Sequence, residues 1–203
     1  MIKNIIFDVG NVLMKFEPQR YTETFGIDRS EQELLYRELF RSVEWVELDR
    51  GTISLDEAQK SVCARLPKNL HKYVDILIHS WYEHIDYLYD AEPVAEALKK
   101  NGYKLYVLSN FGEYFYIVKD KIPAMKYMDG MVISADCHLL KPEKEIYLKL
   151  LNDYSLNAEE CYFIDDSPSN VASAIRCGMK GCVHHNFNIP HLKECLKADG
   201  IKI

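Results

Sequence analysis

The sequence predicts an α/β fold in which a parallel sheet lies between two layers of helices and carries a small inserted helical cap. Short apolar runs of strand length recur along the chain, and helical patterns separate the later runs. This alternation is typical of a parallel sheet with helices on both faces. A long stretch without a convincing strand follows the first run, and it predicts the insertion.

Five apolar runs are the expected strands of the sheet. They span residues 3–7, 103–109, 130–135, 161–165 and 181–185. The helix expected before the second run has Lys99 and Lys100 in its last turn and Gly102 just after it, which is the usual chemistry of a helix C-terminus. The helix before the fifth run ends at Gly178 in the same way. The turn residues therefore agree with the apolar periodicity.

The stretch between the first two runs is too long for one crossover connection. Helical patterns cover residues 30–40, 54–66 and 69–82, and Ser54 and Glu57 have the spacing of a capping box. We therefore expect a helical cap at residues 16–87, closed by a helix that begins near Glu92. The core would then consist of residues 1–15 and 88–203.

Composition excludes several classes of partner. A formal charge of −6, without a basic block or stripe, argues against nucleic acid and anionic membranes. No apolar run approaches the ~20 residues of a membrane-spanning helix, and the first strand-like run begins at Ile2, which leaves no room for a signal peptide. The cysteines lack the paired spacing of a metal site. We expect a cytoplasmic protein, and the sequence makes no prediction of its oligomeric state.

Polar residues follow four of the expected strands, at the edge where open parallel sheets bind ligands. Asp8 follows the first run, Ser109-Asn110 end the second, Lys141 lies beyond the third, and Asp165-Asp166 end the fourth. Each alone is compatible with an ordinary turn, helix cap or surface charge. Together they match the needs of phosphoryl transfer, which are a nucleophile, a site for a hard cation and donors to phosphate oxygens.

These residues also carry a resemblance that covers essentially the whole chain. The segments FDVGNVL, VLSN, LLKPEKEIY and FIDDSPSNVASAIRCG resemble, in this order, the four motifs of the haloacid dehalogenase (HAD) superfamily. The resemblance implies a Rossmann-like core. An insertion directly after the first motif is similar to the C1-type helical cap of the branch that contains sugar-phosphate phosphatases and the N-terminal phosphatase domain of soluble epoxide hydrolase. FDVGNV, with DRGTIS at 49–54, looks closest to the bacterial glucose-1-phosphate phosphatases.

The resemblance implies a role for each residue at the strand ends. Asp8 would be the nucleophile that takes the phosphoryl group as an aspartyl phosphate. Ser109 and Asn110 would bind phosphate oxygens, and Lys141 would balance the charge on Asp8 and on the transferring group. Preorganised positive charge is what a carboxylate attacking a phosphate dianion requires.

The implied cofactor is Mg²⁺. Its ligands would be Asp166, together with Asp165, the Asp8 carboxylate and the backbone carbonyl of Gly10. Asn170, one turn along the following helix, would orient the acidic pair.

Gly10 departs from the pattern of most phosphatases of this superfamily. They place a second Asp there, which protonates the leaving group and then activates water, whereas this chain has only the backbone carbonyl to offer. General acid–base catalysis is typically worth ~10²–10⁴-fold, so the chemistry needs a good leaving group or a substitute acid. A sugar 1-phosphate, with its anomeric oxygen, fits the first condition. Glu17, in the loop that enters the cap, is the candidate for the second.

The cap is expected to select the substrate. Gly51 would permit a tight turn over the site, and Arg50 could reach sugar hydroxyls or phosphate. Arg20 and Trp81 are weaker candidates. His184-His185 has no third metal ligand nearby in the sequence and is expected to end a strand.

The predicted function is therefore an Mg²⁺-dependent phosphatase acting on a small phosphomonoester, with a sugar 1-phosphate as the leading candidate. Two alternatives stay open: a non-catalytic HAD-fold protein that binds phosphate or a protein partner, and a 2-haloacid dehalogenase, which also lacks the second Asp but has no need of the acidic pair. A phosphonoacetaldehyde hydrolase would need a cap lysine such as Lys60, Lys68 or Lys72. A receiver domain is disfavoured because its acidic pair ends the first strand and it carries no cap.

Overall fold

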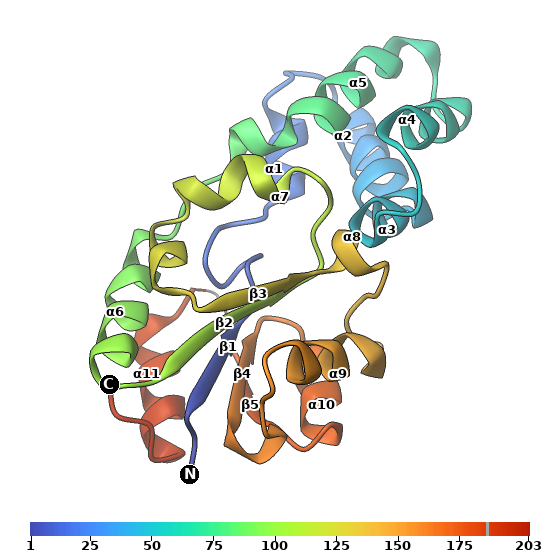
Figure 1. Cartoon of the computed structure of the whole chain (residues 1–203). Coiled ribbons are helices and arrows are strands. Elements are labelled where there is room, and N and C mark those ends of the chain that lie inside the picture. The colour runs from blue at the N-terminus through green and yellow to red at the C-terminus, as the bar shows by residue number, and fades with distance from the viewer. Residues whose placement is uncertain (186) are drawn as a thin grey trace.

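A five-stranded parallel sheet forms the centre of the molecule (Figure 1). The structure is a computed structural model that describes residues 1–185 and 187–203, apart from the side chain of Tyr89. The strand order is β3-β2-β1-β4-β5. The strands are β1 (Asn4–Phe7), β2 (Lys104–Ser109), β3 (Gly130–Ile133), β4 (Cys161–Asp165) and β5 (Lys180–Val183). The predicted α/β fold is confirmed.

Helices cover both faces of this sheet, so the core has three layers. Successive residues of β1 point to opposite faces, and Ile5 and Ile6 belong to different apolar clusters. Helices α6 (Glu92–Lys100) and α11 (Ile189–Ala198) pack on one face, while α9 (Lys144–Asp153) and α10 (Pro168–Arg176) pack on the other (Figure 1).

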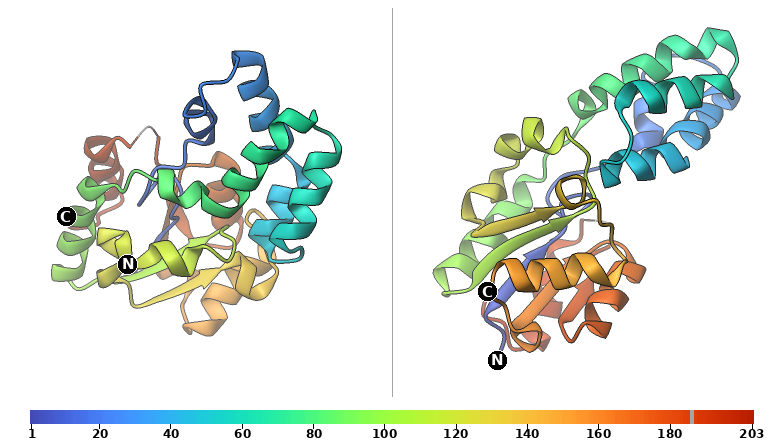
Figure 2. Two further views of the ribbon diagram at one scale, coloured as in Figure 1. Left: turned by 90° about the horizontal axis from the view of Figure 1, so that it is seen from above. Right: turned by 45° about the vertical axis from the view of Figure 1, so that its right-hand side comes forward.

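A helical segment lies beyond the edge at which the strands end (Figures 1 and 2). It contains α1 (Pro18–Glu23), α2 (Arg29–Leu35), the π-helix η1 (Tyr36–Phe40), α3 (Val43–Arg50), α4 (Leu55–Ala64) and α5 (His71–Ser80). The chain enters and leaves this segment side by side, because the backbone of Lys15 donates to Asp86 (2.8 Å) and Met14 pairs with Tyr87. The remaining elements are α7 (Phe115–Val118), α8 (Ser134–Cys137) and the short 3₁₀ turns η2 (Lys68–Leu70), η3 (Trp81–His84), η4 (Tyr89–Ala91), η5 (Lys119–Lys121), η6 (Pro123–Tyr127) and η7 (Ala158–Glu160). No helix of the described residues has the length and apolar character needed to cross a bilayer.

Local sequence explains most helix boundaries. Ser54 and Glu57 form the predicted capping box, with each side chain bonded to the other's backbone N–H. Helix α3 was not expected. It begins after Ser42, whose hydroxyl accepts a hydrogen bond from the Trp45 N–H, and it ends at Gly51, which adopts the left-handed conformation (φ 74°). The stretch 49–51 is therefore the end of a helix rather than an open loop.

The end of α3 is fastened to the core. The Ser134 hydroxyl donates to the Asp49 carbonyl, and the Arg50 guanidinium forms a two-bond ion pair with Glu143. Ser134 begins α8, so the expected third strand over 130–135 stops at Ile133, two residues early. A methyl group added to Gly51 would lie 2.6 Å from the Ala135 carbonyl oxygen, so the two segments approach as closely as glycine allows.

Replacing Gly51 tests this close approach. Gly51→Ala and Gly26→Ala both force alanine into the left-handed region, at a cost of about 1–2 kcal/mol each. Gly26 has open space around it, whereas Gly51 does not. We expect urea unfolding to show a larger loss in the free energy of unfolding for Gly51→Ala than for Gly26→Ala. The difference should be about 1–3 kcal/mol, because the added methyl group overpacks the contact with Ala135. Equal losses in the two variants would show that α3 has room to move away from the core.

Candidate active site

Three carboxylates meet at the end of the two central strands. The register pairs Phe7 of β1 with Ile164 of β4, and the Asp8 N–H continues the ladder to the Ile164 carbonyl at 2.9 Å. Asp8 and Asp165 are therefore neighbours, and Asp166 follows. One carboxylate oxygen of each of the three lies within 4.8 Å of the others. The sequence placed these residues at one sheet edge, and the fold brings them into one cluster.

Lys141 lies among these acids. Its ammonium contacts Asp8 Oδ1 and Asp165 Oδ2, both at 2.7 Å, and the lysine is only 4 % exposed. Burial disfavours its charge, yet the two carboxylates raise the pKa of Lys141 above its ordinary value. Three acids share one buried cation, so the cluster keeps an excess of negative charge.

The excess of negative charge, together with burial, raises the pKa values of Asp8 and Asp166. Burial raises the pKa of Asp8 to about 7 against the pull of Lys141, and the charges of Asp165 and Asp166 raise it further. Burial also raises the pKa of Asp166, although a hydrogen bond from the Asn11 amide (2.9 Å) stabilises its charged form. Both shifts mean that another positive charge would be bound favourably here.

The residues around the cluster use their hydrogen bonds to orient it. Asp165 accepts bonds from the Ser167 N–H at 2.8 Å and from the Asn170 amide at 3.1 Å, as well as from Lys141. The predicted orienting contact of Asn170 is thus present with Asp165. With both oxygens already engaged, Asp165 has less capacity than Asp166 to hold a metal ion.

Ser109 and Asn110 lie beside the cluster, but their side chains contact protein groups. The Ser109 hydroxyl donates to Asp8 Oδ1 at 2.7 Å. The Asn110 amide donates to the Lys141 carbonyl (2.9 Å) and its oxygen accepts from the Lys141 N–H (2.8 Å). Asn110 therefore fixes the Lys141 loop, and phosphate binding by these two side chains stays a prediction.

A cavity of about 210 Å³ opens directly above Asp8. Gly10, Asn11, Asp166 and Asn110 line its polar side, and Met14, Phe16, Trp45, Asp49, Trp81 and Phe111 line the rest. A methyl group added to Gly10 would meet nothing within 4 Å. The missing side chain at this position therefore leaves open space beside Asp8.

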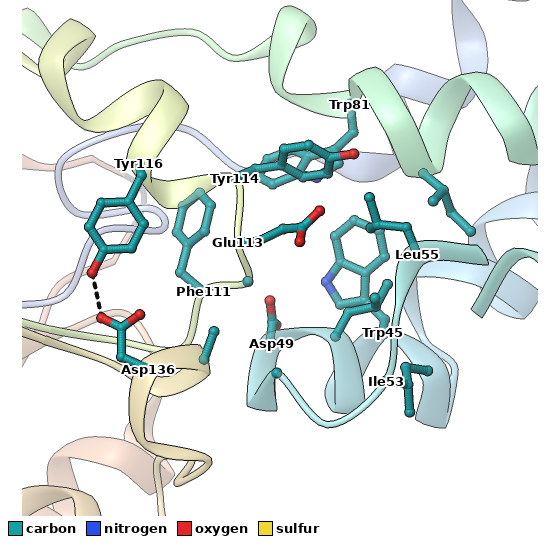
Figure 3. A pocket seen from close by; sticks show the side chains of 15 residues that line it. Trp45, Asp49, Ile53, Leu55, Trp81, Phe111, Glu113, Tyr114, Tyr116 and Asp136 are labelled. Carbon is teal, nitrogen blue, oxygen red and sulfur yellow. Dashed lines mark hydrogen bonds between the residues drawn. The ribbon is translucent and has the colours of Figure 1, made fainter. Parts of the chain in front are cut away.

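Figure 3 shows a second cavity, of about 380 Å³, which adjoins the first through shared wall residues. Trp45, Asp49, Trp81 and Phe111 line both cavities. Its other walls include Ile53, Leu55, Glu113, Tyr114, Tyr116 and Asp136, and among the described residues no lysine, arginine or histidine lines it. The aromatic walls suit a flat ring or the apolar face of a sugar, and the acidic residues disfavour additional negative charge.

Asp49 is the site residue that the sequence reasoning missed. Its carboxylate points into the second cavity between Phe111, Glu113 and Trp45 (Figure 3). Burial raises the pKa of Asp49 to about 8, and the Asp8 charge adds to the effect, while a hydrogen bond from the Gly112 N–H opposes it. Its place directly before Arg50-Gly51 was the available signal.

Of the other predicted cap residues, Trp81 lines both cavities and Gly51 lines the second, whereas Arg50, Glu17 and Arg20 line neither. Arg50 is held by Glu143 (2.6 Å), by the His138 carbonyl and by Glu47, so its guanidinium fastens the cap to the core in this structure. Glu17 forms an ion pair with Arg20 at 2.7 Å, and both residues line two further cavities. One of these shares Asn11, Phe16 and Asp166 with the cavity above Asp8. Roles for Arg50 and Glu17 in substrate binding stay predictions.

The expected last strand over 181–185 stops at Val183, so His184 follows the strand rather than lying within it. The backbone N–H of His184 donates to the Asp165 carbonyl at 2.9 Å, and its ring is buried. Burial lowers the pKa of His184, which favours the neutral ring.

The cluster fits a divalent metal ion and a nucleophilic carboxylate. The hydrogen bond from Ser109 and the ion pair with Lys141 both engage Oδ1 of Asp8, a residue that lines the cavity. Carboxylates in excess over buried cations are the ligands that Mg²⁺ prefers. The arrangement can hold an oxyanion close to Lys141 and present it to a carboxylate oxygen.

Comparisons with known proteins agree with this chemistry. A family model described as haloacid dehalogenase-like hydrolase matches residues 2–178. Flavin mononucleotide hydrolase 1 of Arabidopsis thaliana is 24 % identical over 142 residues, which are 70 % of this chain and 57 % of the plant protein. D-ribitol-5-phosphate phosphatase of Bacteroides thetaiotaomicron is 23 % identical over 84 % of this chain and 86 % of its own length. This chain thus spans little more than half of the plant relative.

Solved structures share the whole fold. A HAD family enzyme from Bacteroides thetaiotaomicron, in complex with magnesium and inorganic phosphate, superposes with a TM-score of 0.72 at 21 % identity and covers 95 % of this chain and 99 % of its own. L-2-haloacid dehalogenase from Xanthobacter autotrophicus gives a TM-score of 0.65 at 15 % identity and covers all of this chain and 85 % of its own. At these identities the likeness establishes the fold.

Removing the buried lysine should expose the charge imbalance. Lys141→Met leaves Asp8 and Asp165 buried without their partner, which typically costs about 3–5 kcal/mol. Lys149→Met is the control, because Lys149 forms an exposed pair with Asp153 worth about 0.3–0.5 kcal/mol. Urea unfolding at pH 8 in EDTA measures the free energy of unfolding of both variants. The loss of this free energy in Lys141→Met should become smaller at acidic pH, where the carboxylates are protonated. A loss no larger than the control's would contradict the charge balance described above.

Proposed function

Because this chain belongs to the haloacid dehalogenase-like hydrolases, we propose that it is a Mg²⁺-dependent phosphatase of small phosphomonoesters. The observation that carries the proposal is the buried Lys141, which contacts both Asp165 and Asp8, a residue that lines the cavity. The phosphatase and hydrolase names of the two curated relatives support it. The chain's own nucleophile would be Asp8.

In the first step, a carboxylate oxygen of Asp8 attacks phosphorus while the bond from phosphorus to the leaving oxygen breaks. The products are an aspartyl phosphate and an alcohol, which takes up one proton. In the second step, a water oxygen attacks phosphorus, the bond to Asp8 breaks, and inorganic phosphate leaves after the water has given up a proton. Lys141 stays charged throughout and stabilises the negative charge near Asp8.

The proposed metal ligands are Asp8, Asp166, the Gly10 carbonyl and, to a smaller extent, Asp165. Gly10 and Asp166 line the cavity above Asp8, which supports their assignment. Mg²⁺ would supply the positive charge that three carboxylates and one lysine lack.

The proposed cap comprises residues 16–87, and its helix α3 forms one wall of both cavities. The leaving group would occupy the second cavity, which we call the aromatic cavity because of its aromatic walls. Its walls favour a neutral leaving group with a ring, which supports a sugar 1-phosphate as substrate and membership of the glucose-1-phosphate phosphatase branch. A flavin-like ring, suggested by the plant relative, fits the same description. A cytoplasmic location also remains part of the proposal.

Phosphate release from a substrate panel tests the function. The panel contains 4-nitrophenyl phosphate, glucose 1-phosphate, ribitol 5-phosphate and flavin mononucleotide, each with Mg²⁺ or EDTA, and 2-chloropropionate to test dehalogenation. We expect Mg²⁺-dependent release that Asp8→Asn abolishes. Glucose 1,6-bisphosphate is the matched control for the acidic cavity and should be hydrolysed more slowly than glucose 1-phosphate. Chloride release, or no turnover above Asp8→Asn, would favour a dehalogenase or a binding protein.

Metal binding can be measured separately from turnover. Asp166→Asn removes a carboxylate whose pKa is raised in the folded protein, so its ionised form costs stability above its ordinary pKa. We expect a higher Tm than wild type in EDTA and loss of the increase that Mg²⁺ causes. In wild type, Mg²⁺ at 100 times its Kd should raise the free energy of unfolding by about 2.7 kcal/mol, which accounts for the higher Tm. Asp153→Asn, at an exposed position, should keep the full Mg²⁺ effect. An unchanged Mg²⁺ response in Asp166→Asn would remove Asp166 from the ligand set.

A further inference from the structure

We propose that Asp49, from the end of α3 in the cap, is the general acid–base of this enzyme in place of the carboxylate that Gly10 lacks. The inference rests on the proposed phosphatase function. It starts from the junction of the two cavities, where a bond between phosphorus and a leaving group would lie. Four residues line both cavities, and Asp49 is the one among them with a titratable side chain.

The position of Asp49 is built by both parts of the molecule. Its carbonyl accepts a hydrogen bond from Ser134 of the core, and its carboxylate lies beside the backbone of Gly112, with Oδ1 4.0 Å from a methyl group added there. A methyl group added to Gly112 would lie 3.1 Å from the Leu48 carbonyl oxygen, so the core loop passes close to the end of α3. The carboxylate is therefore held at the cavity junction by main-chain contacts on both sides.

The surroundings favour the protonated acid. Trp45, Trp81 and Phe111 form the shared wall, and the nearby Asp8 charge opposes ionisation of a second carboxylate. With a pKa raised to about 8, Asp49 carries a proton at neutral pH and can donate it. Neighbouring acids fit less well: Glu17 pairs with Arg20, and Glu113 lines only the aromatic cavity.

The proton balance follows directly. In the first step, the Asp49 carboxyl proton moves to the leaving oxygen as its bond to phosphorus breaks. In the second step, the Asp49 carboxylate accepts a proton from water as the water oxygen bonds to phosphorus. Each turnover therefore returns Asp49 to its protonated form without another reactant.

The test compares two substrates of similar shape, 4-nitrophenyl phosphate and 4-nitrobenzyl phosphate. The phenolate leaves without a proton, whereas the benzyl alkoxide needs one. We expect Asp49→Asn to lower kcat/KM about 10²–10⁴-fold for the benzyl ester and less than about tenfold for the phenyl ester. Asp153→Asn, which neutralises an exposed acid outside both cavities, should leave both kcat/KM values at their wild-type values.

Two further readouts separate proton transfer from a structural role. Asp49→Asn should give a burst of 4-nitrophenol, because the aspartyl phosphate forms but its hydrolysis lacks a base. Gly10→Asp in the Asp49→Asn background should restore turnover of the benzyl ester, since the space beside Gly10 is open. Equal losses on both esters, or no loss, would overturn the role of Asp49. Inactivity of the wild-type protein on both esters would instead overturn the proposed phosphatase, and the inference with it.

Discussion

The ion pairs of Lys141 with Asp8 and Asp165 are the interaction on which the rest of the site depends. A buried ammonium at 2.7 Å from two carboxylates is stable because each charge stabilises the other in a poorly solvated environment. The order of strands makes this possible, since β1 and β4 are adjacent and parallel and end at the same edge. The Asn110 side chain then fixes the loop that carries the lysine. One cation for three acids leaves the negative charge that a metal ion would balance.

The proposed cap lines the cavities opposite the charged cluster with largely aromatic side chains. Helix α3 brings Trp45 and Asp49 to the wall shared by the two cavities, and α5 leads into Trp81 on the same wall. Arg50, Ser134 and the close contact at Gly51 hold this end of the cap against the core. The geometry of the two cavities therefore depends on contacts between segments that are far apart in the sequence.

Much of this architecture could be predicted from the sequence. Strand periodicity and helix-end glycines predicted the sheet, and the parallel arrangement predicted that Asp8, Lys141 and Asp165 would meet. The capping box at Ser54 was also predictable, because it is a local pattern. Helix α3 was missed because its eight residues mix apolar and charged side chains without a clear stripe. Asp49 and Arg50 were hard to assign because their surroundings come from the core loops at 111–112 and 134–143, whose approach no local pattern encodes.

The most direct test of the central claim is to trap the aspartyl phosphate. Borohydride added during turnover of 4-nitrophenyl phosphate reduces an acyl phosphate, and the tryptic peptide of residues 4–15 contains Asp8 as its only carboxylic side chain. We predict that mass spectrometry will show homoserine at position 8, in an amount that depends on substrate and Mg²⁺. An unmodified peptide under conditions of continuing phosphate release would contradict the account, because water would then attack the substrate without a covalent step on Asp8.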